Sequence, residues 1–213
     1  MSEVIKTGPV SVLLVVDVQN DFCPGGALAV PEGDQVVPLI NEIARAFPHV
    51  VFTQDWHTPA HRSFASAHAG MRPFETVRLP YGEQVLWPDH CVQGSTGAAF
   101  HRGLEIDRAE LIIRKGFRRE IDSYSAFFEN DQTTKTGLAG YLRDRGFKTI
   151  YLCGLAYDFC VKWSAVDARR EGFEAVVIED ACRAIDLDGS LGAAKKDMLA
   201  AGVELISTDR FAA

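Results

Sequence analysis

The stretch Tyr151-Leu-Cys-Gly-Leu-Ala-Tyr-Asp-Phe-Cys160 decides how the chain is expected to fold. Its apolar first half predicts a buried strand from Lys148 to Cys153, and Gly154 suits a tight turn. Asp158 is a residue type that begins helices, which places Cys160 in the first turn of the next helix. The positive end of a helix dipole can lower a thiol pKa from about 8.5 to roughly 3.5–7.5. Cys160 is therefore a candidate nucleophile, although an arbitrary cysteine is more often a small apolar packing residue.

The composition favours one domain that acts on a small molecule. The chain has 213 residues, of which 47% are hydrophobic and 24% are charged, so residues 1–213 are expected to form a single domain. A net charge of −7 and a pI near 5.4 argue against nucleic acid or an anionic membrane as a partner. We expect a cytoplasmic protein, since no secretory signal and no apolar run of about 18 residues is found. The five cysteines include no Cys-x-x-Cys pair and are expected to be free thiols.

Apolar runs alternate with segments of helical periodicity along most of the chain. The runs predicted to be strands are 10–16, 49–53, 111–113, 149–153, 175–178 and 203–206, and the predicted helices are 35–47, 137–145, 158–171 and 190–201. This alternation predicts a three-layer α/β/α fold with a parallel sheet of about six strands. Residues 54–108 interrupt the alternation and contain most of the histidines. Because long irregular loops above a parallel sheet usually carry function, this segment is expected to bind metal and substrate.

Reactive side chains follow four of the predicted strands, at the edge of a parallel sheet where ligands bind. These residues are, in strand order, Asp17, Asp55 with His57, Lys115 and Cys160. Each has an ordinary structural explanation by itself, but together they indicate nucleophilic catalysis. We interpret Asp17 as the base that accepts the thiol proton and Lys115 as the cation that keeps Asp17 ionised.

Two further features fit this interpretation. The turn before the predicted helix can direct the N–H groups of Ala156 and Cys160 at one point, which would form an oxyanion hole. Asp55 and His57 are two residues apart, so in an extended chain both side chains point the same way.

A metal site is expected from Asp55, His57 and His90. One carboxylate and two imidazoles suit Zn²⁺, Fe²⁺ or Mn²⁺, with water or substrate in the remaining positions. An Asp–His hydrogen bond in a loop would give part of the same pattern, but the position at a strand end favours a metal. His61, Ser63 or water can complete the metal shell, and the sequence leaves these alternatives open.

Five motifs together identify a family resemblance. They are Asp17-Val-Gln-Asn-Asp-Phe-Cys-Pro-Gly-Gly-Ala-Leu, Asp55-Trp-His with Ser63-Phe, Trp87-Pro-Asp-His-Cys-Val-Gln-Gly, Lys115-Gly with Asp122-Ser-Tyr-Ser-Ala-Phe, and Gly154-Leu-Ala-Tyr-Asp-Phe-Cys-Val. Over nearly its whole length the chain resembles the nicotinamidases and pyrazinamidases, which are isochorismatase-like cysteine hydrolases. The resemblance implies conversion of nicotinamide to nicotinate and ammonia, and of pyrazinamide to pyrazinoate, through a cysteine thioester, in NAD salvage.

The resemblance also implies roles for individual residues. The implied catalytic triad is Asp17, Lys115 and Cys160, and the implied ligands of one divalent metal ion are Asp55, His57 and His90. Phe22 and Trp87 resemble the residues that enclose the substrate ring. Leu155 and Ala156 resemble the pair that forms a cis peptide bond beside the oxyanion hole.

Two other functions share parts of the pattern. A sister cysteine hydrolase that acts on a carbamoyl or ureido amide would use the same triad, but the metal triplet and Trp87 favour nicotinamide. A redox-sensing or metal-binding protein without turnover would leave Asp17 and Lys115 unexplained. The sequence is compatible with a homo-oligomer and does not determine the oligomeric state.

Overall fold

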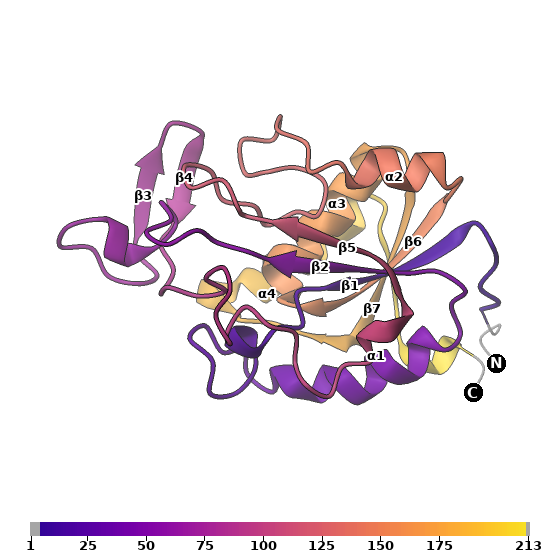
Figure 1. Ribbon diagram of the computed structural model, residues 1–213. Coiled ribbons are helices and arrows are strands. Elements are labelled where there is room, and N and C mark those ends of the chain that lie inside the picture. The colour runs from indigo at the N-terminus through magenta and orange to yellow at the C-terminus, as the bar shows by residue number, and fades with distance from the viewer. Residues whose placement is uncertain (1–4, 212–213) are drawn as a thin grey trace.

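The computed structural model describes residues 5–211 and is built on one six-stranded sheet (Figure 1). The strand order is β5-β2-β1-β6-β7-β8, and all neighbouring strands are parallel. The strands are β1 (Ser11–Val16), β2 (Val50–Asp55), β5 (Ala109–Lys115), β6 (Thr149–Leu155), β7 (Glu174–Arg183) and β8 (Glu204–Ile206). The predicted parallel sheet is confirmed, with a strand at each of the six expected places.

Helices cover both faces of this sheet. Helix α1 (Val36–Ala44) lies on one face, and α2 (Leu138–Asp144) and α3 (Lys162–Arg170) lie on the other (Figure 1). Helix α4 (Ser190–Ala200) packs against α3. All six residues of the central strand β1 are buried, which explains why its sequence is apolar from Val12 to Val16. Among residues 5–211, no helix is long and apolar enough to cross a membrane.

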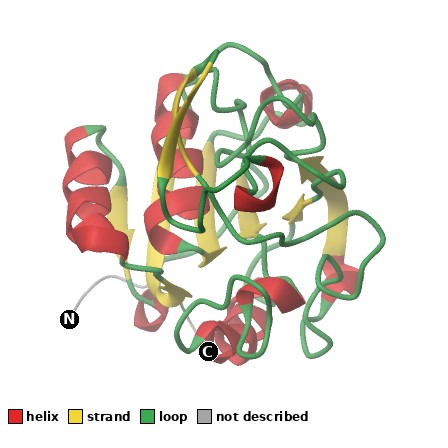
Figure 2. Cartoon of the chain, turned by 90° about the vertical axis from the view of Figure 1, so that its left-hand side faces the viewer, coloured by secondary structure: helices red, strands yellow, loops and turns green. Residues whose placement is uncertain are grey.

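The carboxyl ends of the strands point to one side of the molecule, on the left in Figure 1. Figure 2 shows this side from the front, where loops gather over the strand ends. Much of this layer comes from residues 54–108. This segment is more ordered than expected, because it contains an antiparallel hairpin of β3 (Thr76–Leu79) and β4 (Gly82–Val85). Its strands have only four residues each, too few for a clear alternating pattern in the sequence.

The expected turn at Gly154 is absent, because β6 continues to Leu155. Gly154 has a φ of 118°, and a Cβ atom there would lie 2.1 Å from the carbonyl oxygen of Val16. Glycine is therefore required where β6 passes β1. The chain then forms a π-helical turn, Tyr157–Val161, which begins after Ala156 rather than at Asp158.

Strand β7 is longer than its apolar run predicts. It continues through the polar residues Glu179 and Asp180 to Arg183. The pairing with β6 shifts register between Leu152 and Gly154, and Gly154 then pairs with Cys182. Strand β7 therefore continues to pair with β6 beyond Ile178, where its apolar sequence ends.

Candidate active site

The strand ends bring three of the predicted side chains together around Lys115. The Lys115 Nζ atom lies 2.8 Å from Asp17 Oδ2, 3.0 Å from Asp55 Oδ1 and 3.5 Å from Cys160 Sγ. It also donates a hydrogen bond of 2.9 Å to the carbonyl oxygen of Ser123. Lys115 is 1% exposed. Burial alone would lower the Lys115 pKa, but the carboxylates of Asp17 and Asp55 raise it well above its ordinary value, so the ammonium remains charged.

Asp17 is fixed directly after β1 by the neighbouring strand β2. The Thr53 hydroxyl donates to Asp17 Oδ1 at 2.6 Å, and the Asp17 N–H donates back to Thr53 Oγ1 at 3.1 Å. Complete burial raises the Asp17 pKa above its ordinary value, while Lys115 acts in the opposite direction. A carboxylate whose proton affinity is raised in this way is suited to accept a proton from a weak acid.

The thiol of Cys160 differs from the sequence-based expectation. Burial raises its pKa well above the ordinary value, Asp17 and Asp55 raise it further, and Lys115 opposes them. The position at the start of a helix therefore does not make Cys160 a thiolate, because burial raises its pKa more than Lys115 lowers it. A protonated thiol needs a proton acceptor at the moment it attacks, and Asp17 is the candidate for that role.

The backbone before Cys160 has the unusual geometry expected of it. The peptide bond between Leu155 and Ala156 is cis. Among the backbone hydrogen bonds of residues 5–211, none uses the Ala156 N–H as a donor. Ala156 lines the pocket beside Cys160, so this N–H is available to an oxygen atom of a bound molecule.

The three expected metal ligands converge. The Asp55 Oδ2 atom lies 3.0 Å from His57 Nε2 and 3.5 Å from His90 Nε2. The Nδ1 atoms of the two histidines face carbonyl oxygens, at 2.9 Å for Gly116 and 2.8 Å for Pro88. Since a carbonyl only accepts, each Nδ1 carries a proton, so a deprotonated Nε2 would direct its lone pair at the carboxylate. Burial alone would lower the His57 pKa, but the Asp55 carboxylate raises it above its ordinary value, so His57 must lose a proton when it binds a metal ion. Three acceptors directed at one another fit a bound cation.

His61 and Ser63, the other candidates for the metal shell, are bonded to each other. The Ser63 hydroxyl lies 2.8 Å from His61 Nδ1, and His61 Nε2 lies 2.8 Å from the Arg118 carbonyl oxygen. Both nitrogen atoms of His61 therefore have protein partners. The imidazole rings of His57 and His61 are 4.5 Å apart, so this pair packs against an expected metal ligand.

A narrow, mostly apolar pocket leads to Cys160 and to two of the expected metal ligands, Asp55 and His90. Its lining residues are Phe22, Leu28, Asp55, Trp87, His90, Asp122, Tyr124, Ala156, Phe159, Cys160 and Ile185. Phe22, Trp87 and Ala156 line it as expected. Leu155 does not, since its fully buried side chain points toward Gly33 in the core.

Five of the lining residues had no role in the sequence interpretation: Leu28, Asp122, Tyr124, Phe159 and Ile185. Tyr124 is joined to Trp87, whose Nε1 donates to the Tyr124 hydroxyl at 3.2 Å. The motif that contains Asp122 and Tyr124 was the only sequence signal for these two residues. Phe159 directly precedes Cys160 and could have been found from that position.

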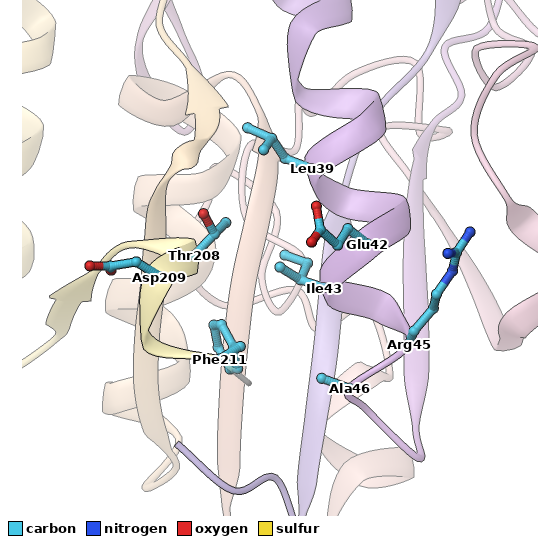
Figure 3. Close-up of a pocket in the computed structure, with 8 residues that line it drawn as sticks. All are labelled: Leu39, Glu42, Ile43, Arg45, Ala46, Thr208, Asp209 and Phe211. Carbon is cyan, nitrogen blue, oxygen red and sulfur yellow. The ribbon is translucent and has the colours of Figure 1, made fainter. Parts of the chain in front are cut away.

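A larger cavity of about 640 Å³ lies elsewhere, between α1 and the segment near the C-terminus (Figure 3). It is lined by Leu39, Glu42, Ile43, Arg45, Ala46, Thr208, Asp209 and Phe211. These lining residues include no cysteine, histidine or lysine. The chemistry of the molecule is therefore concentrated in the smaller pocket.

The comparison with known proteins agrees with this arrangement. The isochorismatase domain family matches residues 11–210. The chain belongs to the isochorismatase family. This family member is 58% identical to a nicotinamidase of Acinetobacter baylyi over 92% of both chains, and 43% identical to a nicotinamidase of Escherichia coli over 92% of this chain and 94% of the relative.

Solved structures of the family match the fold closely. An Acinetobacter baumanii nicotinamidase and pyrazinamidase gives a TM-score of 0.94 at 56% identity, covering 95% of this chain and 98% of the other. A Pyrococcus horikoshii pyrazinamidase in complex with zinc gives a TM-score of 0.75 at 36% identity, covering 93% and 99%. The resemblance inferred from the five motifs is confirmed.

Proposed function

We propose that this protein is a nicotinamidase that hydrolyses nicotinamide to nicotinate and ammonia, and pyrazinamide to pyrazinoate. The observation that carries the proposal is the contact of one buried ammonium, Lys115 Nζ, with Asp17, Asp55 and Cys160 within 3.5 Å. It joins a nucleophile and its base to a histidine-rich metal site. Relatives that share most of the chain's length and are named nicotinamidases support the same substrate.

The reaction is proposed to pass through a thioester. Asp17 accepts the Cys160 thiol proton as sulfur attacks the carboxamide carbon, and the N–H groups of Ala156 and Cys160 stabilise the oxyanion. When the C–N bond breaks, Asp17 returns the proton to the leaving nitrogen, which departs as ammonia. Asp17 then deprotonates a water molecule that attacks the thioester, and nicotinate leaves as Cys160 regains its proton.

Lys115 keeps the charges of this sequence balanced. Its ammonium faces Asp17 and Cys160 together, so it stabilises whichever of them is negative as the proton moves. The same ammonium forms an ion pair with Asp55. Lys115 therefore lies between the proposed nucleophile and one of the proposed metal ligands. Phe22 and Trp87 are proposed to hold the flat ring in the pocket.

Asp55, His57 and His90 would hold a divalent ion, Zn²⁺, Fe²⁺ or Mn²⁺. When bound, the ion would act as a Lewis acid that holds the ring nitrogen of the substrate. The zinc-bound Pyrococcus relative supports zinc among these choices. We further propose that the whole chain is a single catalytic domain that works in NAD salvage in the cytoplasm.

Four amides test the proposal when ammonia release is measured with purified enzyme. Nicotinamide and pyrazinamide carry a ring nitrogen meta to the carboxamide, benzamide carries none, and isonicotinamide carries it one atom away. The first two should be hydrolysed, and kcat/KM for the others should be lower by about two to four orders of magnitude, since a lost contact of about 3–5 kcal/mol has that effect. Hydrolysis of benzamide as fast as of nicotinamide would refute recognition of the ring nitrogen, and no ammonia from nicotinamide would refute the function.

A further inference from the structure

Asp122 is a buried carboxylate in the pocket whose recorded hydrogen bonds come from neutral donors. It is 2% exposed. The Ser123 N–H donates to its Oδ1 atom at 2.8 Å, and Gln84 Nε2 donates to its Oδ2 atom at 3.0 Å. No Lys or Arg side chain among residues 5–211 forms an ion pair with it, and the one possible cation that pairs with it there is the imidazole of His57, which must be neutral when it binds a metal ion.

The carboxylate lies beside the proposed metal ligands. Asp122 Oδ1 is 3.9 Å from His57 Nε2, the same nitrogen that faces Asp55. Two groups of ligand atoms thus share His57, namely Asp55 with His57 and His90, and His57 with His61 and Asp122. The single Nε2 lone pair of His57 can bind only one ion, so the two groups cannot both be occupied. In the second group, both nitrogen atoms of His61 already have hydrogen-bond partners in the protein. The first group is therefore the one that binds the ion directly.

The charges around the site show what Asp122 adds. Three carboxylates, Asp17, Asp55 and Asp122, are buried there with one ammonium, that of Lys115. With neutral histidines, the protein contributes three negative charges and one positive charge. A divalent cation brings the total to zero only if the Asp122 charge is included.

We propose that Asp122 is part of the metal site, where it increases the affinity for a divalent ion without binding it directly. Its charge balances the ion, and its free lone pairs can accept hydrogen bonds from water that accompanies the ion into the pocket. This inference rests on the metal site proposed above. Asp122 is a positioning and charge-balancing residue, and nothing in its role requires it to touch the reacting atoms.

The test is a titration of the chelated full-length enzyme with Zn²⁺ in competition with a chromophoric chelator. Asp122→Asn should weaken zinc binding by about 10- to 100-fold, the usual effect of losing such a partner, and Asp122→Glu should retain most of the affinity. Asp167→Asn is the matched control, because Asp167 is also 2% exposed but belongs to α3 and does not line the pocket. It should bind zinc as tightly as the wild type.

Thermal unfolding supplies a second readout. Zinc should raise the Tm of Asp122→Asn less than it raises the Tm of the wild type, because the variant binds the ion more weakly. A purely structural role predicts a lower metal-free Tm and unchanged zinc affinity. If the Asn variant does not fold, Asp122→Ser replaces it in both measurements.

The outcomes separate the inference from the metal site on which it rests. If neither the wild type nor His57→Ala binds zinc, the proposed metal site itself is wrong. If the wild type binds zinc, His57→Ala does not, and Asp122→Asn binds within about threefold of the wild type, only the role of Asp122 is overturned.

Discussion

Cys160 is held in its protonated form by the same burial that shields the pocket from water. Its reactivity is therefore proposed to depend on side chains that take up the proton, and the four other cysteines have no Lys115 hydrogen bond of the kind that Cys160 has. Cys23, Cys91, Cys153 and Cys182 are buried free thiols, and burial raises the pKa of each. Only Cys160 has both Lys115 within 3.5 Å and a pocket in front of it.

Replacing the thiol should consequently abolish turnover without unfolding the protein. Cys160→Ala is expected to lower kcat by roughly 10⁴-fold or more, as for other nucleophiles that act within a triad. Circular dichroism should be unchanged. Cys23→Ala is the control and should keep near-normal kcat. Turnover by Cys160→Ala close to that of the wild type would exclude the thioester.

The pH dependence should report the state of Asp17. The carboxylate must be ionised to accept a proton, and burial raises its pKa above the ordinary value while Lys115 lowers it. The acidic limb of kcat/KM should therefore lie above the usual range of an aspartate. Lys115→Ala removes the opposing cation, so the remaining activity should have its acidic limb at higher pH. If the acidic limb of Lys115→Ala lies at the same pH as that of the wild type, Asp17 does not control it.

At the scale of elements, the loop between β7 and α4 closes one side of the pocket through Ile185. Asp158, in the π-helical turn next to Cys160, holds this loop. Its Oδ1 atom accepts the Ile185 N–H at 3.0 Å, and its Oδ2 atom accepts the Asp186 N–H at 2.7 Å and the Ser190 hydroxyl. Asp186 has a φ of 55°, which costs free energy that these bonds offset.

Releasing this loop should weaken substrate binding more than it slows chemistry. Asp158→Ala is expected to raise KM for nicotinamide by about tenfold, the equivalent of one or two hydrogen bonds, with a smaller change in kcat. Asp180→Ala is a matched control, because Asp180 accepts similar bonds from Thr208 away from the pocket. Steady-state kinetics distinguish the two variants, because Asp180→Ala should lower the stability of the protein but leave KM unchanged. Equal KM values for both variants would contradict a role for the loop in binding.

The elements that the sequence predicts well are those defined by local pattern. The apolar run of β1 and the helix-period segment of α3 appear close to their expected places. The sequence predicts that Asp17 and Lys115 lie close together because the ends of parallel strands share one edge, and the structure brings them within 2.8 Å of each other. The hairpin β3–β4, in contrast, is short and depends on pairing within a long loop.

Residues brought in by long-range contacts were not predictable in the same way. Ile185 reaches the pocket through the side chain of Asp158, 27 positions earlier in the chain. The thiol pKa of Cys160 was misjudged because the helix start is a local feature, whereas burial and the Asp17 charge depend on the complete fold. Local sequence thus indicates candidate reactive groups, whereas their pKa values depend on the tertiary structure.

At the scale of the whole molecule, the proposed metal ligands come from both the sheet and the loop layer that covers its edge. Asp55 ends strand β2, whereas His90 belongs to the loop after β4. The two regions already touch through a bridge between His57 and Val92. An ion bound by all three ligands would hold this layer against the sheet, so metal binding and folding should be linked.

Removal of the metal should therefore destabilise the enzyme measurably. A ligand present at 100 times its Kd stabilises the native state by about 2.7 kcal/mol, and for a chain of this size 1 kcal/mol shifts Tm by about 2–4 °C. Chelation should lower Tm by about 5–10 °C, and limited proteolysis should then cut within residues 54–108 before the sheet is attacked. His57→Ala should show little response to added zinc, because one ligand that joins the two layers is missing. If chelated and zinc-loaded wild-type enzyme melt together and resist protease equally, the loop layer is held by protein contacts alone and the ion contributes only to the chemistry of the pocket.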